Sequence, residues 1–315
     1  MLRAESNTDT DRRGRLGVAL GGGTARAFAH VGVLKVLAEA GLSPDVLSGA
    51  SFGALIAAHY ALYKDADKLW RWAETFPARE VWQHGLDFGL HRAALVEGGR
   101  VEGWLERTVF HGATFADLKL PLHITCTDVR TGELVVLHGG SYNGSLARAV
   151  RASCALPGIT RAVEVEGRLL IDGGFVSPVP VTPLLTEARF AFGVHAGIAV
   201  EKARSIRRFR TFHASPFGQR WNSRFLGAPD HAYGTLLRGL ARAGASYTRD
   251  PLEDLLTLPD TLLLRVDPPI AWWDLHRAGA GAAAGMQAMR RALPEVQGRL
   301  NKDERVERRA PEGAL

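Results

Sequence analysis

The sequence predicts an α/β fold, a three-layer α/β/α sandwich around a mainly parallel central sheet. Two observations predict it. Over residues 16–63, short apolar runs alternate with stretches of helical spacing, in the order strand, helix, strand, helix. Such a βαβ unit joins parallel strands by a right-handed crossover. The chain has 315 residues, of which 46% are hydrophobic, so it is long enough to bury one large core.

The first elements follow from apolar spacing and from glycines. A buried parallel strand is expected at Leu16–Leu20, where the apolar run ends at three glycines. A helix over residues 25–40 follows and stops at Gly41. The second strand starts at Val46 and ends in a Gly-x-Ser-x-Gly turn, from which "ALIAAHYALY" continues as a helix. Residues 64–118 are expected to be rich in helix.

The second half of the chain carries a hairpin, further strands and a last helix. Two strands, in "LPLHITCTDV" and "GELVVLHGG", flank the short turn "RTG". A helix in "SLARAVRASCALPG" precedes the strand pair of "AVEVEGRLLIDGG", the strands in "RFAFGVHAGI" and "TLLLRV", and the helix "GAAAGMQAMRRALPEV". We therefore expect one domain over residues 16–300 with a basic insertion near 201–247, between disordered tails at 1–15 and 301–315.

Charge and cysteine content indicate the surroundings of the protein. The formal net charge of +6 suits an anionic partner, either a membrane or a nucleic acid. Cys126 and Cys154 lie among small or apolar neighbours, which favours two free thiols and a reducing compartment. The polar N-terminus lacks the apolar core of a signal peptide, and no run reaches the ~20 apolar residues of a membrane span. A cytoplasmic location is expected, with at most peripheral contact at the inner membrane face.

Ser51 stands at the centre of Gly49-x-Ser51-x-Gly53, between a predicted strand and a predicted helix. The small flanking residues allow a sharp turn that lifts the hydroxyl clear of the sheet and points a helix N-terminus at it. The pattern predicts a nucleophilic serine. A chance match is the alternative, because the chain has 35 glycines.

The glycine turn after the first strand predicts an oxyanion hole rather than a phosphate cradle. Turns after neighbouring parallel strands open at the same edge of a sheet, so this loop should face Ser51. The N–H groups of Gly22, Gly23 and Thr24 would then face a substrate carbonyl oxygen. A Walker loop needs Lys-Ser/Thr after the glycines, and a dinucleotide fingerprint needs glycine where Arg26 stands. No nucleotide cofactor is therefore expected, and the spacing of histidines and cysteines predicts no metal site.

Asp172 is the candidate general base. It follows the apolar run "RLLI" and precedes Gly173 and Gly174. A carboxylate at a strand end can reach the edge of the sheet where Ser51 is expected, and loss of hydration in a crevice strengthens it as a base. A purely structural Asp-Gly turn is the alternative.

Three ordered motifs resemble the patatin-like phospholipases. They are "LGGGTARAFAHVGVLKVL", "GASFGAL", and "RASCALPG" running into "GRLLIDGGFVSPVPV", with a further similar segment in "CTDVRTGELVVL". The resemblance covers about residues 16 to 200. It implies a patatin-like fold and a Ser-Asp dyad without a catalytic histidine, in which Ser51 is the nucleophile and Asp172 the base. The loop around Gly22 and Gly23 would form the oxyanion hole.

The activity implied by the resemblance is hydrolysis of a fatty-acyl ester, in a phospholipid or a lysophospholipid, through an acyl-enzyme. The glycine loop departs from the family's Gly-x-Gly-x-x-Gly pattern, because Thr24 and Ala27 stand at two of its glycine positions. A positive φ at a β-branched residue such as Thr24 is costly. Ala27 adds only a methyl group where the helix packs.

Two other functions stay open at this point. An α/β-hydrolase-type esterase would complete a triad with a histidine after Asp172, although only about fifty residues precede Ser51, fewer than the strands of that fold require. The histidines available to it are His195, His213, His231 and His276. A non-catalytic, lipid-binding patatin-like protein is the second alternative, and the departures at Thr24 and Ala27 favour it.

The remaining polar residues of interest have expected structural roles. Arg26 is expected to tie the glycine loop to a neighbouring carboxylate, His30 to pack within its helix, and Asp128 to form a turn. Between Lys202 and Arg224, basic residues alternate with aromatic ones. This composition favours peripheral contact with an anionic membrane, and no nucleic acid partner is expected.

Overall fold

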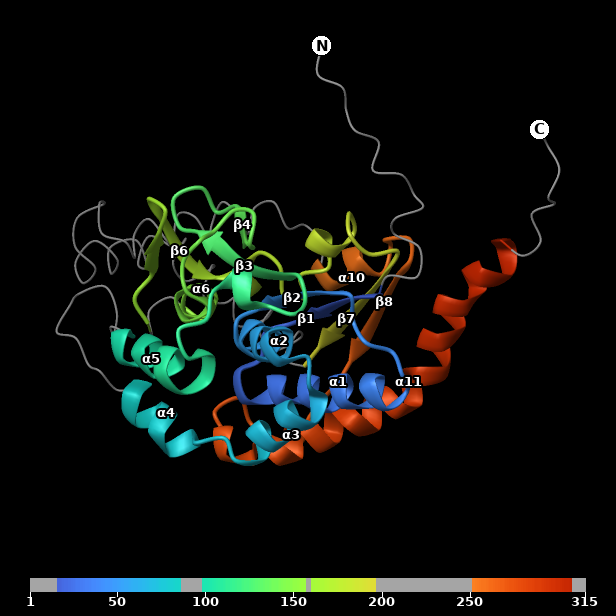
Figure 1. The fold of residues 1–315 in the computed structure, drawn as a ribbon, viewed down its shortest axis with the longest axis horizontal. Helices are drawn as coiled ribbons and strands as arrows, with labels where there is room; N and C mark the ends of the chain where they lie inside the picture. Colours follow the sequence, from blue (N-terminus) through green and yellow to red (C-terminus); the bar gives the residue numbers. More distant parts are fainter. Residues whose placement is uncertain (1–15, 86–97, 157–159, 197–250, 308–315) are drawn as a thin grey trace, which may run out of the picture.

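The computed structural model describes residues 16–85, 98–156, 160–196 and 251–307. Its centre is an eight-stranded sheet with the order β5-β6-β3-β2-β1-β7-β8, in which β4 pairs with β3 (Figure 1). The strands are β1 (Leu16–Leu20), β2 (Val46–Ala50), β3 (Leu122–Asp128), β4 (Leu134–Leu137), β5 (Val163–Val165), β6 (Arg168–Asp172), β7 (Phe190–His195) and β8 (Thr261–Arg265).

The sheet is parallel at its centre and antiparallel at one side. Strands β3, β2, β1, β7 and β8 run in the same direction, whereas β4 and β6 run against β3, and β5 runs against β6. The parallel strands β1 and β2 are buried along their whole length, as the continuous apolar runs of the sequence predict. The predicted α/β class with a mainly parallel central sheet is confirmed.

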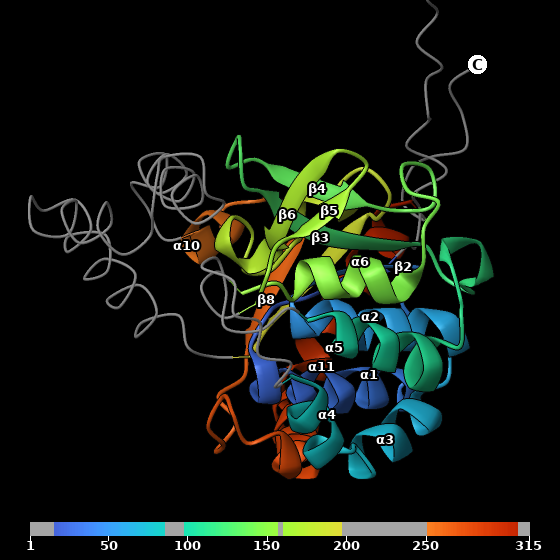
Figure 2. The same ribbon diagram turned by 90° about the vertical axis from the view of Figure 1, so that its left-hand side faces the viewer.

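Helices flank this sheet (Figures 1 and 2). One face is covered by a large core formed with the first two helices, the sixth and the last, and the second face by a smaller cluster that includes the 3-10 turn Thr182–Leu184. The helices are α1 (Ala29–Glu39), α2 (Phe52–Tyr63), α3 (Ala66–Glu74), α4 (Ala78–Gly85), α5 (Gly99–Trp104), α6 (Leu146–Ser153), α10 (Pro251–Leu255) and α11 (Ala278–Glu307).

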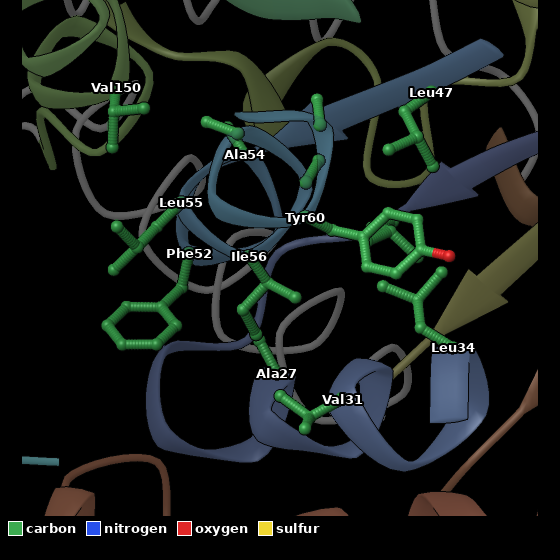
Figure 3. Packing of buried hydrophobic residues seen from close by; sticks show 14 of the residues in the cluster. Ala27, Val31, Leu34, Leu47, Phe52, Ala54, Leu55, Ile56, Tyr60 and Val150 are labelled. Carbon is green, nitrogen blue, oxygen red and sulfur yellow. The ribbon is translucent and has the colours of Figure 1, made fainter. Parts of the chain in front are cut away.

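Helix α2 is fixed against the sheet by apolar contacts. Figure 3 shows the ring of Tyr60 pointing toward Leu34 of α1 and Leu47 of β2. All three side chains are buried, with exposed fractions of 1%, 0% and 0%. Because α2 begins directly after Ser51, this packing also fixes the position of the N-terminal end of α2.

Several boundaries differ from the sequence-based expectation. The helix expected over residues 25–40 begins as a 3-10 turn, η2 (Thr24–Phe28), before α1. The helix expected up to the Pro157-Gly158 pair ends earlier, at Ser153. Helix α11 runs to Glu307, past the tail boundary expected at residue 301.

Two expectations concern membranes. The basic and aromatic stretch between Lys202 and Arg224 lies outside the described residues, as does the expected insertion near 201–247. Within the parts of the chain that the structure describes, no helix combines the length and the apolar character that crossing a bilayer requires.

Candidate active site

Ser51 occupies a sharp turn between β2 and α2. Its backbone has φ 55° and ψ −133°, a conformation that L-residues rarely adopt. Gly53 in the first turn of α2 packs so closely that a Cβ there would overlap the carbonyl oxygens of Leu20 and Gly21, at the end of β1. A Cβ at Gly49 would be crowded in the same way by the backbone of Ala54. The glycines of the motif therefore let α2 start against the end of the neighbouring strand.

A chain of buried hydrogen bonds holds this turn. The backbone N–H of Ser51 donates to Oγ of Ser153, at 2.8 Å, and the Ser153 hydroxyl donates to the carbonyl oxygen of Thr125, at 2.7 Å. The Thr125 hydroxyl in turn donates to the carbonyl oxygen of Gly49, at 3.1 Å. The chain links β2, β3 and the end of α6. Sequence analysis missed Ser153, whose one signal is its place in "RASCALPG", a motif that we singled out.

The strand register brings Ser51 and Asp172 to the same level of the sheet. The last pair between β2 and β3 joins Ala50 to Thr125, so Ser51 follows at the level of Cys126. Strand β4 pairs with Ile124 and Cys126 along the opposite edge of β3, so β6 continues on the same edge as β2, beyond the end of β2. Its last residue, Asp172, pairs with Cys126. Ser51 and Asp172 therefore meet at one position along the same edge of β3, where β2 ends and β6 ends.

Asp172 reaches this position from the opposite direction to the one that parallel strands suggest. Strand β6 is antiparallel to β3, and it returns to the carboxyl edge of the parallel strands because β3 extends beyond β2. The carboxylate is 4% exposed, and its Oδ1 accepts a hydrogen bond from the N–H of Gly174, at 2.7 Å. The Asp-Gly turn is thus present, and it fixes the orientation of the carboxylate. A Cβ at Gly173 would overlap the Thr125 carbonyl.

The thiol of Cys154 lies beside both residues. Burial raises its pKa, the charge of Asp172 raises it further, and a hydrogen bond with the side chain of Ser51 opposes the shift. Burial also raises the pKa of Cys126, with a contribution from Asp172. Both cysteines are free, as expected. At neutral pH both stay protonated, so they line the site as neutral groups.

The glycine loop lies directly against Ser51. A Cβ at Gly22 would lie 3.2 Å from Cβ of Ser51 and 3.8 Å from its Oγ, so a larger residue there would crowd the serine. The N–H of Gly22 donates to the carbonyl oxygen of Pro178, at 3.3 Å. Among the residues that the structure describes, the N–H groups of Gly23 and Thr24 have no acceptor. These two are the donors that remain for an oxyanion.

Thr24 adopts the strained conformation that the sequence indicated, with φ 50°. Such a backbone costs on the order of 1–3 kcal/mol and persists only where the surroundings hold it. Arg26 supplies part of that support: its guanidinium donates to the carbonyl oxygens of Ala196 and Ile270, each at 3.2 Å, and forms an ion pair with Asp267. The structural role expected for Arg26 is observed.

His30 packs beneath the same loop. The side chain is fully buried, and its Nε2 lies 2.7 Å from the carbonyl oxygen of Gly21. Burial lowers the pKa of His30 to about 4, so the ring is neutral at pH 7. Asp128 forms the expected turn, because its Oδ1 accepts from the N–H of Arg130, at 2.8 Å.

The four histidines that an esterase triad could use lie in different parts of the chain. His195 ends β7, with β1 between that strand and β2, and is 8% exposed. His276 is exposed in the 3-10 turn Leu275–Arg277. His213 and His231 lie outside the described residues.

Comparison with known protein families decides the assignment. The family described as patatin-like phospholipase matches residues 18–185, from β1 to the loop before β7. The chain belongs to the patatin-like phospholipase family. The match includes the glycine loop, the Ser51 turn and the Asp-Gly-Gly segment, so the resemblance inferred from the motifs is confirmed.

Curated relatives carry related names. An uncharacterised NTE family protein of Mycobacterium tuberculosis is 32% identical over 170 residues, which are 54% of this chain and 45% of that protein. Lysophospholipase nte1 of Aspergillus fumigatus is 30% identical over 258 residues, which are 81% of this chain and 16% of that protein. The chain thus spans less than half the length of these relatives.

Two solved structures are more distantly similar. VipD from Legionella pneumophila matches with 16% identity and a TM-score of 0.43, over 90% of this chain and 69% of that one. The complex of SpcU with ExoU from Pseudomonas aeruginosa matches with 16% identity and a TM-score of 0.36, over 75% of this chain and 53% of that one.

Proposed function

We propose that the protein is a serine lipid acyl hydrolase that cleaves fatty-acyl esters of phospholipids or lysophospholipids. One observation carries the proposal: the register of β3 with β2 and β6 aligns Ser51 and Asp172 at Cys126, beside a glycine loop that touches Ser51. The family membership and the name lysophospholipase among the relatives support a lipid ester as substrate.

In the proposed reaction, Oγ of Ser51 attacks the ester carbonyl carbon while its proton passes to Asp172. The carbonyl oxygen becomes an oxyanion, which accepts hydrogen bonds from the N–H groups of Gly23 and Thr24. The carbon–oxygen bond to the alcohol then breaks, and the leaving alcohol takes the proton from Asp172. An acyl group remains on Ser51.

The second half of the reaction returns the enzyme to its starting state. A water molecule attacks the acyl carbon and gives a proton to Asp172, and Ser51 leaves with that proton as the fatty acid departs. Each oxyanion donor contributes roughly 3 kcal/mol to the stability of the transition state, so strain at Thr24 would weaken the reaction without abolishing it.

Hydrolysis by single variants tests the dyad. The assay offers lysophosphatidylcholine, phosphatidylcholine and a short-chain soluble ester to the full chain. Ser51→Ala should lower kcat on the order of 10³-fold or more. Asp172→Asn should lower it about 10²- to 10⁴-fold, the usual contribution of a general base.

Histidine variants separate the dyad from a triad. Alanine at His195, His213, His231 or His276 should in each case leave kcat within a few-fold of the unsubstituted chain, because the proposed mechanism uses no histidine. A loss as deep as that of Asp172→Asn in one of them would favour the triad. A pure protein that hydrolyses none of the esters would instead support the non-catalytic alternative.

Contact with an anionic membrane through the stretch Lys202–Arg224 stays part of the proposal. Each basic side chain near an anionic leaflet contributes about 1 kcal/mol of binding free energy, screened by salt. Support comes from the sequence of that stretch alone.

A further inference from the structure

Two tryptophans protrude from a closed turn after β8. The turn spans Ala271 to Asp274, and both of its ends are tied: the N–H of Asp274 donates to the carbonyl oxygen of Ala271, at 3.1 Å, and the N–H of Ala271 donates to Oδ2 of Asp274, at 3.0 Å. Trp272 and Trp273 occupy the two central positions. Such positions normally hold small or polar residues, so two indoles there are unusual.

Few large apolar side chains in the described parts of the chain are as exposed as these two. Trp272 is 41% exposed and Trp273 53%, and their rings lie nearly perpendicular with centroids 5.3 Å apart. In the described ranges, Leu256 is the one other large apolar side chain with comparable exposure, at 59%. Leu256 precedes β8 and the tryptophans follow it, so they lie at opposite edges of the parallel strands.

The turn is fastened to the glycine loop beside Ser51. The N–H of Ala25, in η2, donates to the carbonyl oxygen of Trp272, at 3.1 Å. Arg26 donates to the carbonyl oxygen of Ile270 and pairs with Asp267, on the strand side of the turn. The chain between β8 and α11 that carries the turn is drawn in orange in Figures 1 and 2. The tryptophans therefore stand on a rigid support next to the proposed oxyanion donors.

We propose that the Trp272–Trp273 turn is a membrane anchor, which seats its two indoles among the headgroups of a lipid bilayer. The purpose of the anchor rests on the proposed function, because a lipid ester enters the site from a lipid surface. Indole rings favour this depth, since their apolar body faces the acyl chains and their N–H faces water. Arg26 and Asp267 beside the turn neutralise each other, and the carboxylate of Asp274 within it accepts from the N–H of Ala271, so no free positive charge calls for an anionic lipid and the anchor binds zwitterionic lipid.

The size of the patch favours a lipid surface over a second copy of the chain. A tryptophan side chain can bury about 250 Å² of surface, so the exposed parts of the two rings present roughly 200 Å² of apolar surface. A stable protein–protein interface needs about 800 Å² on each partner. Two indoles side by side are enough to enter a headgroup layer, which adapts its shape around them.

Vesicle binding tests the anchor without hydrolysis. The full chain carrying Ser51→Ala is sedimented with phosphatidylcholine vesicles at low and high salt, with and without the pair Trp272→Ala and Trp273→Ala. The pair should lower the partition coefficient at least tenfold, equally at both salt concentrations. Leu256→Ala, the matched control at the opposite edge, should leave it unchanged. A partition coefficient that the tryptophan pair does not change would overturn the proposal.

Further arms keep the result interpretable. The pair Trp272→Phe and Trp273→Phe preserves the aromatic turn and should retain most of the binding, which separates loss of the anchor from loss of the fold. With Ser51 intact, the alanine pair should hydrolyse a soluble short-chain ester at the rate of the unsubstituted chain. If no ester is hydrolysed but vesicle binding still depends on the tryptophans, the proposed function fails and the anchor stands. A dimer in light scattering that the alanine pair converts to monomer would overturn the anchor in favour of an interface between copies.

Discussion

At the scale of single residues, the conformation of Ser51 is the feature on which the site depends. The residue has φ 55°, and its buried N–H group finds, among the residues that the structure describes, one acceptor, the fully buried hydroxyl of Ser153. A side chain on such a strained turn stays in place only if its surroundings over-determine it. In the proposed reaction, Ser153 is therefore a positioning residue, which acts through Ser51.

Ser153→Ala should weaken catalysis by misplacing the nucleophile. An unsatisfied buried N–H costs about 1–3 kcal/mol, and part of that cost can be relieved by relaxation of the Ser51 turn. We expect kcat for a soluble ester to fall on the order of tenfold, while KM changes little. Ser145→Ala is the matched control, because Ser145 caps the other end of the same helix by accepting from the N–H of Arg148. That variant should lose about 1 kcal/mol of unfolding free energy and keep kcat. An unaltered kcat in Ser153→Ala would refute the positioning role.

At the scale of elements, α1 and α11 form a close helix–helix contact. The two helices approach so closely that a Cβ at Gly285 would overlap the carbonyl oxygen of Ala29, and a Cβ at Gly32 would overlap that of Ala282. Helix α1 follows η2 and the glycine loop, so α11 supports the loop through α1.

Gly285→Ala should destabilise this contact. Overpacking of a close helix pair costs about 1–3 kcal/mol, because the helices have to move apart. Gly298 lies in the same helix and is exposed, and a Cβ there would have no atom of the described residues within 4 Å. Gly298→Ala should therefore raise the unfolding free energy by about 0.5–1 kcal/mol. Urea denaturation of both variants checks the sign, and equal effects of the two would contradict the close approach.

The order of elements was predictable from sequence because local patterns encode it. The apolar run at Leu16–Leu20 and the glycines that follow it require no long-range information. The approach of Asp172 to Ser51 was not predictable in the same way. It depends on β3 extending beyond the end of β2 and on the antiparallel pairing of β6 with that extension. Strand register between distant segments leaves no local signal.

The parts of the site that sequence analysis missed have weaker signals. Ser153 resembles any small residue near a helix end, and its bond to Ser51 joins residues far apart in sequence. Two adjacent tryptophans beside an aspartate, in "AWWD", were a visible signal for the Trp272–Trp273 turn. We did not use that signal because tryptophan is more often buried than exposed.

At the scale of the whole molecule, buried neutral histidines link stability to pH. Burial lowers the pKa of His30 and of His59 to about 4, from 6.5 for an ordinary histidine. Between pH 6.5 and 4 the unfolded chain binds protons that the folded chain does not, so stability falls as the pH falls through this window. Each histidine should contribute a loss on the order of 2 kcal/mol between pH 7 and pH 5.

The variant His59→Phe tests this linkage. His59 stacks on Trp72 with ring centroids 4.8 Å apart, and phenylalanine preserves a stacked ring without a titrating group. Urea denaturation at pH 7 and pH 5 should show a smaller loss of stability in the variant, by about the contribution of one histidine. His276→Ala, at an exposed histidine, should show the same loss as the unsubstituted chain. A pH dependence that His59→Phe leaves unaltered would mean that the ring titrates normally in the folded state.

The central claim is that Ser51 is the nucleophile and Asp172 its base. The most direct measurement is labelling of the full chain with a fluorophosphonate probe, followed by mass spectrometry of the peptides. The account predicts one adduct, on the peptide that contains Ser51, absent in Ser51→Ala and formed at least a hundredfold more slowly in Asp172→Asn, in line with the contribution of about 10²-fold or more expected of a general base. An adduct on another residue, or labelling of Asp172→Asn at the rate of the unsubstituted chain, would contradict it.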